Sequence, residues 1–301
     1  MKIWLDTDIG PDCDDTAALG ILLELCHRGF GELACVTHCT SSPWGVPVID
    51  LITGIDDVHV PVGTCKRRGF LEEGPSQRYT KPLMQQYGLL SPDRDAQANA
   101  LDTARSLLRT AAEHEITLIA IGPLNNIAAC FQDEELRGLM NAKLERIVVM
   151  GGCFEREQVF PEWNIQMDIP AAKLVTETFD GSICFAPFEA AENILVGNCL
   201  RKWTDHPIEI SYRLYTEGGY LRPSWDLVAV YAAMRGANAL ISSSPNGVVS
   251  INEDGVTIFR EAKRGKATYL RSPSLQLVDE LESLLDCFCG RTQANAMQRL
   301  R

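Results

Sequence analysis

Five carboxylates lie within ten residues near the start of the chain: Asp6, Asp8, Asp12, Asp14 and Asp15. They follow a short apolar run at residues 3–5 and precede a helix-like apolar run at residues 16–25. So many like charges repel one another, and no Lys or Arg between Lys2 and Arg28 offsets them. Because hard divalent cations take carboxylate oxygens as ligands, the residue types predict a metal site. The simpler alternative is a solvated acidic turn in which Asp14 or Asp15 caps the helix.

Two further features of this segment favour the metal site. The acids come directly after a predicted strand, and open α/β sheets bind ligands at the carboxyl ends of their strands. The dipeptide Gly10-Pro11 supplies a tight turn that can fold the acids toward one point.

The overall composition restricts the class of partner. The chain has 301 residues, and 28 basic against 40 acidic residues give a net charge of -12. This charge argues against a nucleic-acid backbone or an anionic membrane as the main partner. No linker composition interrupts the chain, so we predict one domain over residues 1–301.

The eleven cysteines bear on the cellular compartment. They are scattered through apolar runs and form no Cys-x-x-Cys pair, which is typical of reduced core thiols in a cytoplasmic protein. No apolar run is long enough to span a membrane, and we expect no signal peptide before the first strand.

Alternating apolar runs predict an α/β fold: an open, mostly parallel sheet with helices on both faces. Strands are predicted at residues 3–5, 32–37, 58–62, 116–121, 145–150 and 182–186. Helices are predicted at residues 44–55, 96–114, 124–131, 170–178, 226–235 and 275–285. Residues 64–95 read as a long loop, and residues 248–251 and 256–259 as a hairpin.

Three later segments carry polar groups suited to the same site. Gly122-Pro123-Leu124-Asn125-Asn126 follows a strand that should end beside the acidic loop, where a freed backbone carbonyl can bind a hard metal. Glu162 and Asn164 offer an acceptor and an amide, which suit sugar hydroxyls. Asp226 stands at a predicted helix start, where taken alone it reads as an N-cap.

Together these segments resemble the inosine-uridine-preferring nucleoside hydrolase family. The resemblance follows most of the chain in order: the Asp-rich loop, the Gly-Pro-Leu-Asn-Asn-Ile-Ala segment, the Gly151-Gly152 turn, the Glu-Trp-Asn segment and the late Trp-Asp-Leu helix. It implies an open, mostly parallel sheet and Ca²⁺-dependent hydrolysis of the N-glycosidic bond of ribonucleosides. It further implies a nucleoside-like small-molecule substrate and a cytoplasmic homodimer or homotetramer.

The resemblance also implies roles for particular residues. Asp8 resembles the metal-binding aspartate that acts as general base, and Asp15 resembles the bidentate calcium ligand. The backbone carbonyl of Asn125 and the carboxylate of Asp226 complete the implied metal set. The implied substrate-binding residues are Asp14, Glu162, Trp163, Asn164 and Trp225. Because the first motif is two residues longer than usual, the roles of Asp12 and Asp14 can be exchanged.

Three departures from the family pattern concern the substrate. Trp225 stands where many members have a His that protonates the leaving base, and Arg156 stands where a second Asn contacts the sugar. The segment after the second strand reads Thr37-His38-Cys39-Thr40 instead of the usual Gly-Asn. These differences predict retained metal and ribose binding, and they leave open which group activates the leaving base.

Two other classes remain as alternatives. A Mg²⁺-dependent phosphatase of the haloacid dehalogenase type also begins with a strand and an Asp-x-Asp, but needs a later Ser or Thr that Gly151-Gly152-Cys153 does not offer. A non-catalytic relative that binds ribosyl ligands is motivated by Trp225. His38 is a candidate acid, although a lone His is more often structural. Tyr212, Tyr215 and Tyr220 are candidates for stacking on a base, although such aromatics more often pack in the core.

Overall fold

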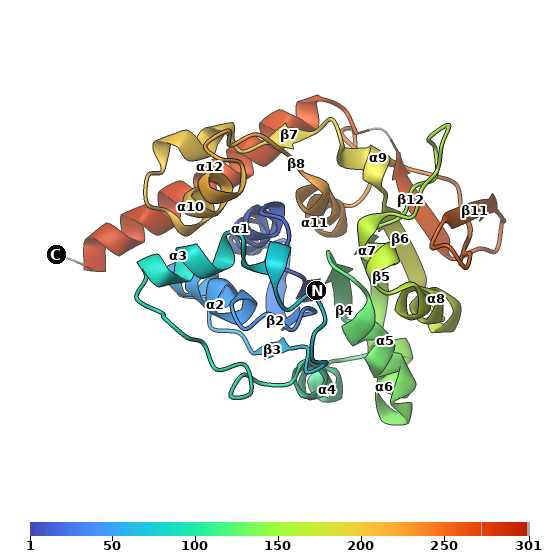
Figure 1. Cartoon of the computed structure of the whole chain (residues 1–301). Helices are drawn as coiled ribbons and strands as arrows, with labels where there is room; N and C mark the ends of the chain where they lie inside the picture. Colours follow the sequence, from blue (N-terminus) through green and yellow to red (C-terminus); the bar gives the residue numbers. More distant parts are fainter. Residues whose placement is uncertain (272, 300–301) are drawn as a thin grey trace.

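The computed structural model describes residues 1–271 and 273–299, which fold around one large β-sheet (Figure 1). The strands of this sheet are β1 (Lys2–Thr7), β2 (Glu32–His38), β3 (Val62–Thr64), β4 (Ile116–Ala120), β5 (Leu144–Met150), β6 (Ser182–Ala186), β9 (Ser242–Ser243), β10 (Gly247–Ile251), β11 (Thr257–Glu261) and β12 (Ala267–Arg271). Two short strands, β7 (Leu195–Val196) and β8 (Arg222–Pro223), pair separately.

The strand order across the sheet is β11-β10-β12-β6-β5-β4-β1-β2-β3, with β9 paired to β12. All neighbours from β3 through β12 are parallel, whereas β9, β10 and β11 form an antiparallel edge. The order reverses at β1, because the chain first adds β2 and β3 on one side and later β4, β5 and β6 on the other. Such a reversal opens a crevice at the carboxyl ends of the two central strands, here β1 and β4.

Helices cover both faces of the sheet (Figure 1). They are α1 (Asp14–His27), α2 (Gly45–Ile55), α3 (Thr80–Gln86), α4 (Ala100–Thr110), α5 (Asn125–Gln132), α6 (Glu134–Lys143), α7 (Trp163–Met167), α8 (Ile169–Thr178), α9 (Phe188–Ala191), α10 (Pro207–Tyr215), α11 (Trp225–Arg235) and α12 (Gln276–Arg299), with 3₁₀ turns η1 (Gly74–Gln77) and η2 (Asn198–Lys202).

Two apolar clusters fill the space between sheet and helices. Helices α1, α2, α10, α11 and α12 contribute to one cluster, and α4, α5, α6 and α8 contribute to the other. Strand β1 supplies both, since Ile3 and Leu5 belong to the first and Trp4 to the second. A strand buried on both faces needs apolar residues at every position, which explains the continuous apolar runs of the sequence. The predicted open, mostly parallel sheet with helices on both faces is therefore confirmed.

Some predicted boundaries are wrong. The third strand does not occupy residues 58–62 but begins at Val62, because Pro61 has no N–H to donate and only accepts from the Val36 N–H, at 3.0 Å. The predicted loop at residues 64–95 contains η1 and α3. The helix predicted at 96–114 is shorter, since Asn99 caps its start by accepting from the Leu101 N–H at 2.9 Å. In the described part of the chain, no helix is long and apolar enough to cross a membrane.

Candidate active site

The floor of the site is the crevice between β1 and β4. Asp8 follows β1, and the turn after β4 packs directly against it. The Ile121 N–H donates to the Asp6 carbonyl at 2.8 Å, which extends the pairing of the two strands to this point. A Cβ on Gly122 would lie 2.6 Å from Cys39 Sγ and 2.9 Å from the Asp8 backbone nitrogen. Only glycine allows this close approach, so β4 ends beside Asp8 as the sequence predicted.

Three carboxylates from two helices converge above this floor. Asp14 and Asp15 begin α1, and Asp226 lies in the first turn of α11. Each offers an oxygen within 4.8 Å of the others, and all three side chains are buried. Thr7 Oγ1 donates to Asp15 at 2.5 Å, and the Asp226 N–H donates to Asp14 at 3.1 Å. These contacts hold the helix starts together at the carboxyl end of β1.

The simpler interpretations of these acids are wrong. The N-cap residue of α1 is Cys13 and that of α11 is Ser224, and neither side chain makes a capping hydrogen bond. Asp14, Asp15 and Asp226 therefore do not act as caps. The loop is also not a solvated turn, because these three carboxylates and that of Asp8 are nearly inaccessible to solvent.

The electrostatics of the cluster call for a counter-charge. Burial, with the nearby charges of Asp12 and Glu162, raises the pKa of Asp8 to about 8. Burial and mutual repulsion also raise the pKa values of Asp14, Asp15 and Asp226 well above the ordinary aspartate range. A divalent cation bound among them would relieve both effects. The donor set, which consists of crowded carboxylate oxygens, fits a hard ion such as Ca²⁺.

Asp12 differs from its neighbours because it has a cationic partner. Arg222 Nε lies 3.0 and 3.1 Å from its two carboxylate oxygens, and Arg222 Nη2 also donates to it. The Asp12 side chain is 25% exposed, whereas Asp14 is buried beside Asp226. Asp14 thus lies nearer the acidic centre, and Asp12 forms the link from that centre to Arg222.

A second wall of the site comes from the segment before α7. Glu162 is the N-cap of this helix and accepts from the backbone N–H groups of Gly152, Asn164 and Ile165 at 3.0 to 3.4 Å. Burial raises the pKa of Glu162 to about 7, although these hydrogen bonds oppose the shift. The Asn164 side-chain amide donates to the Met150 carbonyl at 3.2 Å. Both side chains are therefore held in place at the end of β5.

A third wall is aromatic. Trp225 Nε1 donates to the Phe188 carbonyl at 2.9 Å, and the two rings lie 5.2 Å apart. The Arg222 guanidinium carbon lies 5.2 Å from the ring centre of Trp225 and equally far from that of Tyr215. Trp225 is thus wedged between a ring and a cation, both of which sequence reasoning missed.

These walls enclose a cavity of about 610 Å³. It is lined by all the predicted site residues except Asn125: Asp8, Asp14, Asp15, Glu162, Trp163, Asn164, Trp225 and Asp226. Trp163 is 44% exposed and forms part of the rim. The Asn125 side chain donates instead to the Cys39 carbonyl, at 2.9 Å.

The cavity also contains residues that the sequence did not single out, among them Arg78, Phe160, Phe188 and Arg222. No spacing rule marked them, because Arg78 comes from a segment read as a loop and the other three lie in the loop before α7, in α9 and in β8. Of the three candidate tyrosines only Tyr215 lines the cavity. Arg156, which replaces the second sugar-binding Asn, is paired with Glu192 at 2.5 Å.

His38 does not belong to the site. Its side chain is buried, Nδ1 lies 3.2 Å from Thr64 Oγ1, and Nε2 lies 3.1 Å from Thr40 Oγ1. Burial lowers its pKa to about 4. None of the five histidines, all within the described residues, lines the cavity. The structural interpretation of His38 is therefore the better one, and no imidazole reaches the site.

Comparison with known proteins identifies the family. The model of the inosine-uridine preferring nucleoside hydrolases matches residues 3–269, which is most of the chain. The chain belongs to this family of N-glycosyl hydrolases, as the sequence predicted, and the phosphatase alternative is wrong. No curated protein sequence matches the chain significantly.

Solved structures agree in fold. The inosine-uridine preferring nucleoside hydrolase from Bacillus anthracis is 17% identical, with a TM-score of 0.69 over 95% of this chain and 99% of its own. The purine-preferring ribonucleoside hydrolase from Gardnerella vaginalis is 17% identical, with a TM-score of 0.73 over 96% and 99%. The type III effector protein XopQ, complexed with adenosine diphosphate ribose, is 15% identical, with a TM-score of 0.69 over 97% and 94%.

Proposed function

We propose that this protein hydrolyses the N-glycosidic bond of a ribonucleoside or related ribosyl compound and that it requires Ca²⁺. The observation that carries the proposal is the buried group of Asp8, Asp14, Asp15 and Asp226 at the β1/β4 crevice. Family membership supports the reaction class. The raised pKa values support the cation, because four buried acids cannot all ionise without one.

Asp8, Asp15 and Asp226, with the backbone carbonyl of Asn125, are the proposed cation ligands. When bound, Ca²⁺ would supply positive charge that orients ribose hydroxyls and a water, with only a modest effect on the pKa of that water. Asp14 lies within the same acidic group and is the proposed contact for the ribose hydroxyls beside the cation.

Asp8 is the proposed general base. It would take a proton from the water that attacks C1′ of an oxocarbenium-like sugar, while the bond from C1′ to the leaving nitrogen breaks. Burial raises the pKa of Asp8 and so disfavours its ionised form. Its role as a base therefore requires a counter-charge beside it, which is a second reason to expect a cation.

Glu162 and Asn164 are the proposed ribose-binding pair. The carboxylate of Glu162 is oriented by three backbone N–H groups, and the Asn164 amide is oriented by the Met150 carbonyl. Side chains held in this way lose little further freedom when hydroxyl groups bind, which favours precise placement of the sugar. Trp163 at the rim and Trp225 on the aromatic wall would contact the rest of the substrate.

The test is hydrolysis of p-nitrophenyl riboside, whose leaving group needs little acid assistance. We expect Ca²⁺-dependent release of p-nitrophenolate by the parent, and a loss of about 10²–10⁴ in rate for Asp8→Ala. Asp254→Ala, an exposed aspartate in the turn between β10 and β11, is the matched control and should retain activity. Full activity in Asp8→Ala, or in chelator-treated protein, would contradict the proposal.

A second candidate function is binding of a ribosyl ligand without turnover. It is favoured because none of the histidines in the described part of the chain lines the cavity. A nucleoside that binds with a measurable dissociation constant, but is not cleaved with Ca²⁺ present, would favour this function over hydrolysis.

A further inference from the structure

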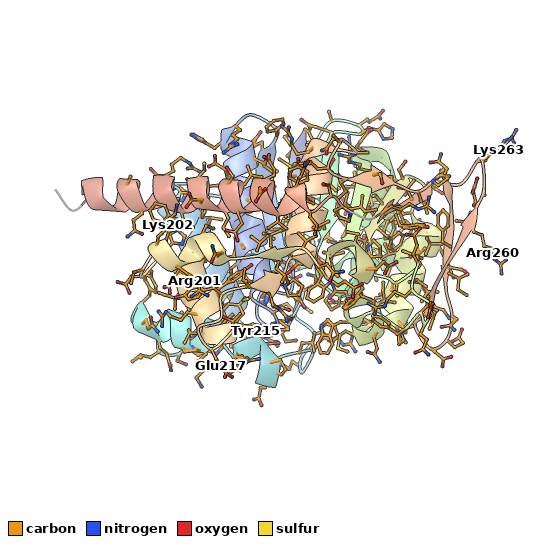
Figure 2. All side chains as sticks on the ribbon, turned by 90° about the horizontal axis from the view of Figure 1, so that it is seen from above. Arg201, Lys202, Tyr215, Glu217, Arg260 and Lys263 are labelled. Carbon is orange, nitrogen blue, oxygen red and sulfur yellow. The ribbon has the colours of Figure 1, made fainter. Side chains whose placement is uncertain are left out.

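Two arginines lie close to the Tyr215 ring in the lining of the cavity. The guanidinium carbon of Arg78 lies 4.6 Å from the ring centre of Tyr215, and that of Arg222 lies 5.2 Å from it. All three residues line both the main cavity and an adjoining hollow of about 400 Å³. Figure 2 shows Tyr215 and Glu217 at one margin of the molecule. A pair of cations at this position is notable in a chain with a net charge of -12.

Both guanidinium groups keep donors that protein acceptors do not use. Arg222 uses Nε and Nη2 for Asp12 and Tyr215, whereas its Nη1 donates to none of the described residues. The Arg78 side chain donates no hydrogen bond within the same residues, and its nearest acid is Glu217, at 3.5 Å. Since the Glu217 side chain is 86% exposed, this pair is screened by solvent and is readily exchanged for another anion.

The rest of the cavity indicates which part of a ligand would reach these donors. Glu162 and Asn164 provide hydroxyl-binding groups on one wall. Phe188, Trp225 and Tyr215 make another wall aromatic, which suits contact with an apolar, planar group such as a heterocycle. A ligand with its sugar at the acidic floor would extend its heterocycle toward the aromatic wall, where Tyr215 lies beside Arg78 and Arg222.

We propose that Arg78 and Arg222 bind a carboxylate carried by the leaving heterocycle, so that the preferred substrates are ribosyl compounds of such acidic heterocycles. The proposal rests on the proposed function and names its substrate class. Guanidinium groups bind carboxylates through parallel, charge-assisted hydrogen bonds, and both Arg78 and Arg222 have donors available for such bonds in the lining of the same cavity.

The reaction on a pyridinium riboside balances without an acid from the protein. The oxygen of water bonds to C1′ and one water proton passes to Asp8. The bond between C1′ and the ring nitrogen breaks, and its electron pair leaves with a pyridine that is neutral at nitrogen. Such substrates need no acid to protonate the leaving group. They therefore suit this cavity, which none of the described histidines lines.

The experiment compares nicotinate riboside with nicotinamide riboside, which differ only in a carboxylate and a carboxamide. We expect the parent to favour nicotinate riboside in kcat/KM by about tenfold or more, the effect of one charge-assisted hydrogen bond. Arg78→Gln should reduce this preference by about threefold to tenfold, since Arg78 is half-exposed. Glu217→Gln removes the competing carboxylate and should increase the preference.

Arg201→Gln is the matched control. Arg201 is also exposed and also lies over a tyrosine, 4.7 Å from the ring centre of Tyr220, but it does not line the cavity. Arg201→Gln changes the net charge by as much as Arg78→Gln does, but away from the cavity. The preference for nicotinate riboside over nicotinamide riboside should therefore stay unchanged in this variant. If the parent shows no preference, or if Arg201→Gln lowers it as much as Arg78→Gln, the proposal is wrong.

Calorimetric binding of the same two ribosides separates this proposal from the proposed function. If neither is cleaved but nicotinate riboside binds more tightly, and Arg78→Gln removes that difference, the carboxylate site stands while hydrolysis fails. If p-nitrophenyl riboside is cleaved but the two ribosides bind and react equally, hydrolysis stands and the carboxylate site fails.

Discussion

Glu162 provides a test of the cost of burying an acid at this site. The residue is 3% exposed, and burial raises the pKa of its carboxyl group from an ordinary value of 4.5 to about 7. The native state therefore binds a proton that the unfolded chain has already lost at pH 5 to 7. Stability contributed by this group is present below the unfolded pKa and is lost as the pH rises through the folded pKa.

The magnitude follows from the two pKa values. Between pH 5 and pH 8 the linkage relation predicts that Glu162 alone removes about 2.5 kcal/mol from the free energy of unfolding. Glu162→Gln does not titrate and keeps an oxygen that can accept from the N–H groups of Gly152 and Asn164. The difference in unfolding free energy between parent and variant should therefore move by about 2–3 kcal/mol, in favour of the variant, as the pH rises.

The assay is urea denaturation of chelator-treated protein at pH 5, 6, 7 and 8. Asp8 and the other buried acids titrate in both proteins. Their contributions to the unfolding free energy therefore cancel, to first order, in the difference between the parent and Glu162→Gln. Glu253→Gln is the matched control, because the same chemical change falls on a side chain that is 93% exposed. Its difference from the parent should stay constant.

The reasoning would be refuted by a parent-to-Glu162→Gln difference that varies by less than about 0.5 kcal/mol over this range, because one pKa unit corresponds to about 1.4 kcal/mol. If the parent instead becomes more stable relative to Glu162→Gln as the pH rises, the hydrogen bonds to Glu162 lower its pKa by more than burial raises it.

Three further predictions concern catalysis. Metal analysis of protein purified without chelator should find about one Ca²⁺ per chain, the number that one carboxylate cluster can hold; protein that is active and metal-free would disprove this. Glu162→Ala should mainly raise KM with a smaller change in kcat, because Glu162 is expected to bind sugar and not to move a proton; a loss confined to kcat would reassign it. The parent should cleave p-nitrophenyl riboside faster than inosine or adenosine, because the leaving purines benefit from protonation. Trp225→His should reduce this difference in rate between the two kinds of substrate. Equal rates in the parent would mean that another residue supplies the proton.

The sequence alone was sufficient for the fold class and for eight of the residues that line the cavity. Continuous apolar runs at residues 116–121 and 145–150 predict doubly buried strands, and the turn residues after them mark the carboxyl ends where ligand groups gather. Glycine at residue 122, the acids near residue 8 and the Glu162–Asn164 pair are local features. They are therefore visible in a single chain without knowledge of its packing.

Tertiary structure alone decided which acids are buried together and which have partners. Asp226 and Asp14 are 212 residues apart, and only the packing of α11 on α1 brings the Asp226 N–H to the Asp14 carboxylate. The Asp12–Arg222 pair spans 210 residues, and Arg78 reaches Tyr215 from a segment without periodicity. Contacts at such separations depend on how helices pack against the sheet. Residue spacing therefore predicted the acidic loop, whereas the cations beside it emerged only when the chain was folded.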